Sequence, residues 1–123
     1  MQLSIRTDTI GTTVVLRVAG AADIASAPTL GVQVAELIRR SDCDIVVDLS
    51  DTTFLDSTAL SVLLNINRRA TRAGLGSAVV CPPGPARTPM RIARLEETLR
   101  VYDSETEALR CVEELRRRRD GDE

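Results

Sequence analysis

Three consecutive residues near the middle of the chain, Asp56, Ser57 and Thr58, bring a carboxylate and two hydroxyl groups together. They separate a short apolar segment, Asp44–Leu49, from a stretch in which apolar residues recur at helical spacing. We therefore expect a strand, a turn over Ser50–Leu55, and then a helix whose first free N–H groups bind the Asp56 side chain. This arrangement places the Ser57 hydroxyl at a helix N-terminus beside a carboxylate.

The Ser57 hydroxyl lacks a group that could activate it as a nucleophile, because the chain contains no histidine and all its basic residues are arginine. The same hydroxyl is well placed to accept a phosphate, which in the first turn of a helix gains about 0.3–1 kcal/mol from the helix dipole. A phosphate would add about −1.5 to −2 charge at pH 7 and repel a partner that covers this surface. The alternative is that Ser57 and Thr58 are ordinary first-turn residues.

The rest of the chain alternates strand and helix signals. Leu3–Asp8 and Thr12–Ala19 are expected to form an antiparallel hairpin. Gly20–Ala25 is then expected to be a loop, and Ser26 to cap a helix that runs to about Arg40. The helix that follows Asp56 is expected to end at Gly74, and a strand over Leu75–Cys81 comes next. A short helix over Pro89–Leu95 and a brief strand at Val101-Tyr102 follow. The last helix is expected to run from a Ser104–Glu107 capping box to about Arg118.

This alternation predicts an α/β fold, with a mixed, mostly parallel β-sheet of four or five strands, an N-terminal β-hairpin and about four helices. A single domain is expected over residues 1–115, followed by a charged C-terminal tail at 116–123 that should be frayed and solvated. The C-terminal ends of parallel strands share one edge of a sheet, where binding sites concentrate. Three loops should meet there: Gly20–Ser26, Ser50–Asp56 and Cys81–Thr88. They should gather one acidic, hydroxyl-bearing patch, namely Asp23, Asp51, Asp56, Ser57 and Thr58.

The composition argues against several classes of function. A formal charge of −2 gives no reason to expect nucleic acid or direct membrane binding. No apolar run is long enough for a membrane span, and the N-terminus lacks the features of a signal peptide, so a cytoplasmic protein is expected. The three cysteines, Cys43, Cys81 and Cys111, have no metal-ligand spacing and are expected to be structural thiols, with a redox-sensitive Cys81–Cys111 pair as the alternative. No cofactor, metal site or enzyme activity is expected.

Several segments together resemble the STAS-domain family, and within it the bacterial anti-sigma factor antagonists. The resemblance covers most of the chain. Its carrying segments are Gly20–Asp23 with Ala27-Pro28, the strand Ile45–Ser50, the run Phe54–Leu60, and Glu107-Ala108-Leu109 at the start of the last helix. The family's phosphorylation motif, Asp-Ser-Ser/Thr-Gly-Leu/Ile, aligns its serine with Ser57, and the family's loop aspartate aligns with Asp23. The environment of the phosphorylation site would comprise Asp23, Asp56 and Thr58.

The resemblance implies partner switching by a protein that catalyses nothing itself. The unphosphorylated antagonist would bind an anti-sigma factor that is also a serine kinase, and sigma factor would be released. The kinase would end the complex by phosphorylating Ser57, and a PP2C-type phosphatase would reverse the modification. The residues expected to face the partner or the margin of the core are Ala59, Leu60, Ser61 and Leu64.

Two departures from the family pattern bear on the interaction with the kinase, and the first of them favours a second hypothesis. Ala59 stands where the family usually has glycine, and its methyl group would obstruct close approach by a partner. Gly20–Asp23 also lacks the Glu-Leu centre of the family's loop motif. The alternative function is therefore that of a non-phosphorylated STAS scaffold or a subunit of a transporter complex.

Overall fold

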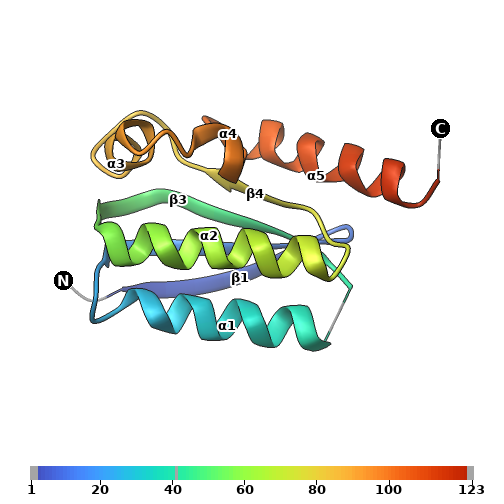
Figure 1. The fold of residues 1–123 in the computed structure, drawn as a ribbon, viewed down its shortest axis with the longest axis horizontal. Coiled ribbons are helices and arrows are strands. Elements are labelled where there is room, and N and C mark those ends of the chain that lie inside the picture. The colour runs from blue at the N-terminus through green and yellow to red at the C-terminus, as the bar shows by residue number, and fades with distance from the viewer. Residues whose placement is uncertain (1–2, 41, 122–123) are drawn as a thin grey trace.

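A computed structural model describes residues 3–40 and 42–121. The described chain forms one five-stranded sheet in the order β1-β2-β3-β4-β5, with β1 antiparallel to β2 and every other pair parallel. The strands are β1 Ser4–Ile10, β2 Thr13–Ala22, β3 Asp44–Leu55, β4 Ser77–Val80 and β5 Val101–Tyr102. The helices are α1 Ala27–Arg40, α2 Ser57–Arg72, α3 Arg87–Ile92, α4 Glu96–Leu99 and α5 Glu105–Arg119 (Figure 1). The expected α/β fold with an N-terminal hairpin is confirmed. The helix expected over Pro89–Leu95 is α3, which begins and ends earlier, and α4 was not expected.

The sheet is covered on both faces, which explains why its central strands are almost continuously apolar. Alternate residues of β2 point to opposite sides. Leu16 packs in a core with α1, α2, α3 and α4, whereas Val15 packs in a smaller core with α5. Figure 1 shows that α1 and α2 run side by side and that both begin at the same end of the molecule. That end is the edge at which β2 and β3 finish, so the connectivity places the start of α2 beside the loop that follows β2.

The second halves of β2 and β3 differ from the prediction, because Gly20–Ala22 and Ser50–Leu55 are strand rather than loop and turn. The two strands stay paired through a bulge with register shifts at Arg17/Ala19 and Gly20/Ala21. Gly20 has a φ of 99° there, which residues with a side chain rarely adopt. The buried Thr52 hydroxyl donates to the Val18 carbonyl at 2.9 Å. The bulge therefore lets both strands continue to the edge that carries Ser57.

The end of α2 and both ends of α5 follow the sequence prediction, whereas the tail expected from residue 116 does not. Gly74 ends α2 with a φ of 76°, and Ser104 caps α5 by accepting a hydrogen bond from the Glu107 N–H at 3.3 Å. The helix α5 extends to Arg119, beyond the point where a solvated tail was expected. Its last turns are held by ion pairs from Arg116 and Arg119 to the buried carboxylate of Asp44 at the start of β3. These contacts join the end of the chain to the sheet.

The strand β4 spans Ser77–Val80, which is shorter than the Leu75–Cys81 segment expected. Among the helices of the described residues, none has the length and apolar character needed to cross a membrane. The same residues contain no cluster of three metal-ligating side chains.

Candidate functional site

Asp56 organises the start of α2. Its backbone is extended, with φ −104° and ψ −174°, and its Oδ1 accepts a hydrogen bond from the Ala59 N–H at 3.0 Å. The predicted N-cap is therefore confirmed. The second carboxylate oxygen, Oδ2, accepts from the Ile24 N–H at 3.0 Å, and the Asp56 N–H donates to the Ala22 carbonyl at 3.3 Å. One side chain thus fastens the helix start to the loop after β2.

That loop is itself built around the carboxylate of Asp23. Its Oδ1 accepts hydrogen bonds from the N–H groups of Ala25 and Ser26, each at 3.0 Å, and lies 2.9 Å from the Ser26 hydroxyl. The Ser26 hydroxyl also lies 2.8 Å from the Ala21 carbonyl oxygen, so it binds the loop and does not cap α1 as predicted. These hydrogen bonds, led by the one from the Ser26 side chain, hold the pKa of Asp23 below its ordinary value. Asp23 is therefore ionised at neutral pH.

Ser57 is the first residue of α2, and its side chain is exposed. Within residues 3–40 and 42–121 its hydroxyl has no hydrogen-bond partner, while Asp56 already occupies the Ala59 N–H. The N–H groups of Ser57 and Thr58 precede the first intrahelical hydrogen bond, which the Leu60 N–H donates to the Asp56 carbonyl at 3.0 Å. A group attached to the Ser57 oxygen would therefore meet two N–H donors and the positive end of the helix dipole.

The double role of Asp56 leads to a stability prediction. Asp56→Ala removes an N-cap and the acceptor for the Ile24 N–H, so we expect the free energy of unfolding to fall by about 1–2 kcal/mol. Urea denaturation measures this change. Amide hydrogen exchange should also accelerate at Ile24 and Ala59 in the variant. Asp56→Asn, which keeps an acceptor oxygen, should recover most of the loss, and equal stability of Asp56→Ala and the wild type would contradict the assignment.

The expected partner-facing residues separate into two groups. Ala59 is only 3% exposed and packs in the core, so its methyl group does not lie on the surface that a partner would meet. Leu60 and Leu64 are half-buried at the margin of that core, and Ser61 is exposed one turn after Ser57. Thr58, assigned to the environment of Ser57, is half-buried. The feature that favoured a scaffold function, an obstructing methyl at position 59, is therefore absent from the surface.

Asp51 does not join the patch around Ser57. It pairs with Ala19 in the sheet and lines a small pocket with Arg6, Arg17 and Asp48. The Arg17 guanidinium also binds Glu105 of α5 at 2.6 Å, which places this group on the α5 face of the sheet. The acidic patch predicted from the sequence is reduced to Asp23 and Asp56, because a strand rather than a turn carries Asp51 to the other face.

The structure does not bring Cys81 and Cys111 together. Cys81 is buried in the core that includes residues of α1–α4, whereas Cys111 belongs to α5 on the opposite face of the sheet. All three cysteines are free thiols. Burial raises the pKa of the Cys81 thiol to about 11, which suppresses its thiolate form at neutral pH. The geometry favours structural thiols over a redox pair.

The raised pKa of Cys81 makes two measurable predictions. At pH 8 iodoacetamide should label Cys43 and Cys111, which are half-buried, well before Cys81, as peptide mass spectrometry can show. Because the folded protein binds the Cys81 proton more tightly than the unfolded chain, stability should decrease as the pH rises from about 9 to about 11. Cys81→Ser should remove this part of the pH dependence. Labelling of Cys81 as fast as Cys111 would contradict the burial argument.

Two exposed apolar residues near Ser57 were not singled out from the sequence. Ile24 is 74% exposed, although its N–H is bound by Asp56 beside the start of α2. Phe54 is 51% exposed, two residues before Asp56. Large apolar side chains held at the surface next to a polar site are typical of protein–protein contacts. The available signal was that the chain has only two aromatic residues and that one of them, Phe54, lies two residues before the Asp-Ser-Thr motif.

Comparison with known proteins identifies related sequences. Residues 4–108 match the family model of the STAS domain. The anti-sigma F factor antagonist of Paenibacillus polymyxa is 29% identical over 101 residues, covering 80% of this chain and 86% of that protein.

Solved structures share the fold. An anti-sigma factor antagonist from Mycobacterium paratuberculosis has a TM-score of 0.83 at 24% identity, covering 91% of this chain and 95% of that one. The anti-sigma factor antagonist SpoIIAA in its unphosphorylated form gives 0.75 at 18% identity, covering 89% and 96%. Its phosphorylated form from Bacillus gives 0.67 at 18% identity, covering 89% and 99%. The family match, which spans all five strands and the helices α1–α4, identifies this chain as a member of the STAS domain family.

Proposed function

We propose that this chain is an anti-sigma factor antagonist that is switched off by phosphorylation of Ser57. The observation that carries the proposal is the exposed Ser57 hydroxyl at the N-terminus of α2, which has no hydrogen-bond partner among the described residues and which Asp56 holds beside the Asp23 loop. A relative 29% identical to this chain is named an anti-sigma F factor antagonist, and the similar fold of SpoIIAA is known in a phosphorylated form. Both facts support the proposal.

In the unphosphorylated state the surface around Ser57 would bind an anti-sigma factor, which would then release its sigma factor. This surface comprises exposed or half-buried residues on α2 and the loop before α1, namely Ile24, Ser57, Leu60, Ser61 and Leu64. The bound anti-sigma factor would also act as the kinase. The kinase would transfer the γ-phosphoryl group of ATP to Ser57 Oγ. A new bond forms between Oγ and the γ-phosphorus, the bond from that phosphorus to the β,γ-bridging oxygen breaks, and ADP is released. The serine proton passes to a base of the kinase.

A phosphate on Ser57 would end the complex through charge and solvation. It adds about −1.5 to −2 charge at pH 7 beside the carboxylates of Asp23 and Asp56. The two free N–H groups at the start of α2 and the helix dipole stabilise the phosphate in the free protein. The modified chain therefore stays folded. It no longer binds, because a partner that covers this surface would have to desolvate the phosphate. A PP2C-type phosphatase, which uses its own metal ions, would hydrolyse the ester and restore binding in the cytoplasm.

Incubation with ATP and the anti-sigma factor kinases of the same organism tests the proposal. Peptide mass spectrometry should find one phosphate, on the peptide that contains Ser57, and none on that peptide from Ser57→Ala. A PP2C-type phosphatase should remove it. Modification at another residue only, or at none with every kinase of this type, would refute the proposal and favour a scaffold function.

A further inference from the structure

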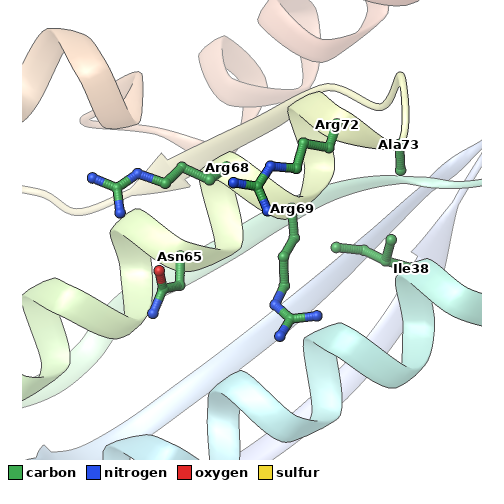
Figure 2. A pocket seen from close by; sticks show the side chains of 6 residues that line it. All are labelled: Ile38, Asn65, Arg68, Arg69, Arg72 and Ala73. Atoms are coloured by element: carbon green, nitrogen blue, oxygen red, sulfur yellow. The ribbon is translucent and has the colours of Figure 1, made fainter.

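The exposed side of α2 carries a second surface, toward the end of the helix opposite to Ser57. Three arginines, Arg68, Arg69 and Arg72, line a groove together with Ile38 of α1, Asn65 and Ala73 (Figure 2). Figure 2 shows the Arg69 side chain reaching toward α1, while those of Arg68 and Arg72 lie along α2. Within residues 3–40 and 42–121, no carboxylate lines this groove and no ion pair joins these three guanidinium groups to an acidic residue.

The helix dipole explains only part of this cluster. Arg69 and Arg72 lie in the last turn of α2, where cations are stabilised by the C-terminal end of the dipole. The neighbouring helix α1 also ends in two arginines, but both of those lie against the Glu36 carboxylate of their own helix. The helix α2 contains no acidic residue at all, in a chain whose net charge is −2. Its positive face is therefore left uncompensated.

The basic groove continues into an apolar one. The adjoining section shares Asn65 and Arg69 with it and is otherwise lined by apolar residues of both helices, namely Pro28, Gly31, Val32, Ala35, Val62 and Ile66. Val32 is 70% exposed. The two helices are in contact here, since a Cβ built at Gly31 would lie 3.4 Å from Val62 Cγ1, an ordinary van der Waals distance. The α1–α2 groove is thus apolar toward the helix starts and basic toward their ends.

We propose that the α1–α2 groove docks an acidic amphipathic helix of a protein partner. Apolar side chains of that helix would cover Val32 and Val62, and its carboxylates would pair with Arg68, Arg69 and Arg72, which is the helix-in-groove mode of recognition. Three arginines fall short of the four to eight basic residues of a typical acidic-lipid site, and of the roughly six to ten phosphate contacts of a nucleic-acid site. A protein segment with both apolar and acidic residues matches both halves of the groove.

This docking does not rest on the phosphorylation of Ser57. Arg68 lies eleven residues after Ser57 in the same helix, or roughly 16 Å along the axis. That distance exceeds the Debye length of about 8 Å at physiological ionic strength, so a charge at Ser57 is largely screened from the arginines. The groove would hold its segment in both states of Ser57.

Titration with a synthetic amphipathic helix, with leucines on one face and glutamates on the other, tests the proposal. Amide chemical-shift changes should concentrate on the residues that line the groove, and the affinity should fall as salt is raised. The triple variant Arg68→Gln/Arg69→Gln/Arg72→Gln should bind about tenfold more weakly, as expected for the loss of three exposed ion pairs. Circular dichroism should show the same helix content, because glutamine is as good a helix former as arginine.

A matched control carries the same loss of charge elsewhere. Arg6→Gln/Arg91→Gln/Arg110→Gln alters three exposed arginines on β1, α3 and α5 and should bind the peptide as the wild type does. Equal affinity of the two triple variants would overturn the proposal. The proposal would also be overturned if a peptide with lysines in place of the glutamates bound as tightly, or if the amide chemical-shift changes lay outside the groove. Binding of duplex RNA or phosphatidylserine vesicles to the groove in preference to the peptide would overturn it as well.

Discussion

Ser57→Asp is expected to weaken binding of the proposed anti-sigma factor by at least about 100-fold, equivalent to about 2.7 kcal/mol. The new carboxylate would lie beside those of Asp23 and Asp56, and a covering partner would have to desolvate it. The fold should be unaffected, because an acidic residue in the first turn of α2 is favoured by the helix dipole. Ser57→Ala should bind persistently in the presence of ATP, since it cannot be modified. Isothermal titration calorimetry with the kinase measures both effects.

The control for this prediction is Thr106→Asp. Thr106 is exposed in the first turn of α5, one position further into its helix than Ser57 is in α2, so the substitution adds the same charge to the first turn of another helix. We expect it to leave binding within about twofold of the wild type. Equal affinities for Ser57→Asp and Ser57→Ala would show that the charge at position 57 does not govern the interaction.

Asp44→Ala is expected to lower the free energy of unfolding by about 3 kcal/mol. Asp44 is fully buried at the start of β3, where its Oδ1 accepts a hydrogen bond from the Gly76 N–H at 2.8 Å. Its Oδ2 accepts from Arg116 Nε at 2.9 Å, and Arg119 Nη1 lies 3.3 Å from Oδ1. Substitution by alanine leaves the buried Gly76 N–H group without its acceptor. It also removes the carboxylate that pairs with Arg116 and Arg119 of α5. Urea denaturation monitored by circular dichroism measures the loss.

Glu114→Ala provides the comparison for Asp44→Ala. Glu114 also pairs with two arginines of α5, Arg117 and Arg118, but its side chain is 46% exposed. Exposed pairs of this kind contribute little, so we expect a change of less than about 0.5 kcal/mol. Loss of stability of similar size in both variants would mean that burial of Asp44 is not what makes its contacts strong. The last two turns of α5 should also exchange amide hydrogens faster in Asp44→Ala.

Local features of this fold were predictable from the sequence because neighbouring residues determine them. Asp56 caps α2 since an aspartate just before an amphipathic run meets the free N–H groups of the first turn. The Ser104–Glu107 capping box and the stop at Gly74 depend on residues within one turn. The hairpin of β1 and β2 follows from alternating apolar residues around a glycine.

Features that depend on distant contacts were not predictable in this way. A turn was expected over Ser50–Leu55 because its first four residues are polar, but β3 is polar there because β4 pairs with it only as far as Asp48. The same error put Asp51 on the wrong face. The bond between Asp56 and Ile24 joins residues 32 apart, and the pairing of Asp44 with Arg116 joins residues 72 apart. No local pattern encodes either contact, although the first of them builds the candidate site.

The two oxygens of Asp56 have a further consequence for recognition. Because they bind the Ile24 and Ala59 N–H groups together, the loop and the helix start form one preorganised epitope. Most of the conformational entropy of this epitope is lost during folding, so little remains to be lost on association. We expect its backbone to move little between the free and bound states, with side-chain rotamers making the adjustment. Such a surface can be turned on and off repeatedly by one covalent charge, without a cycle of local refolding.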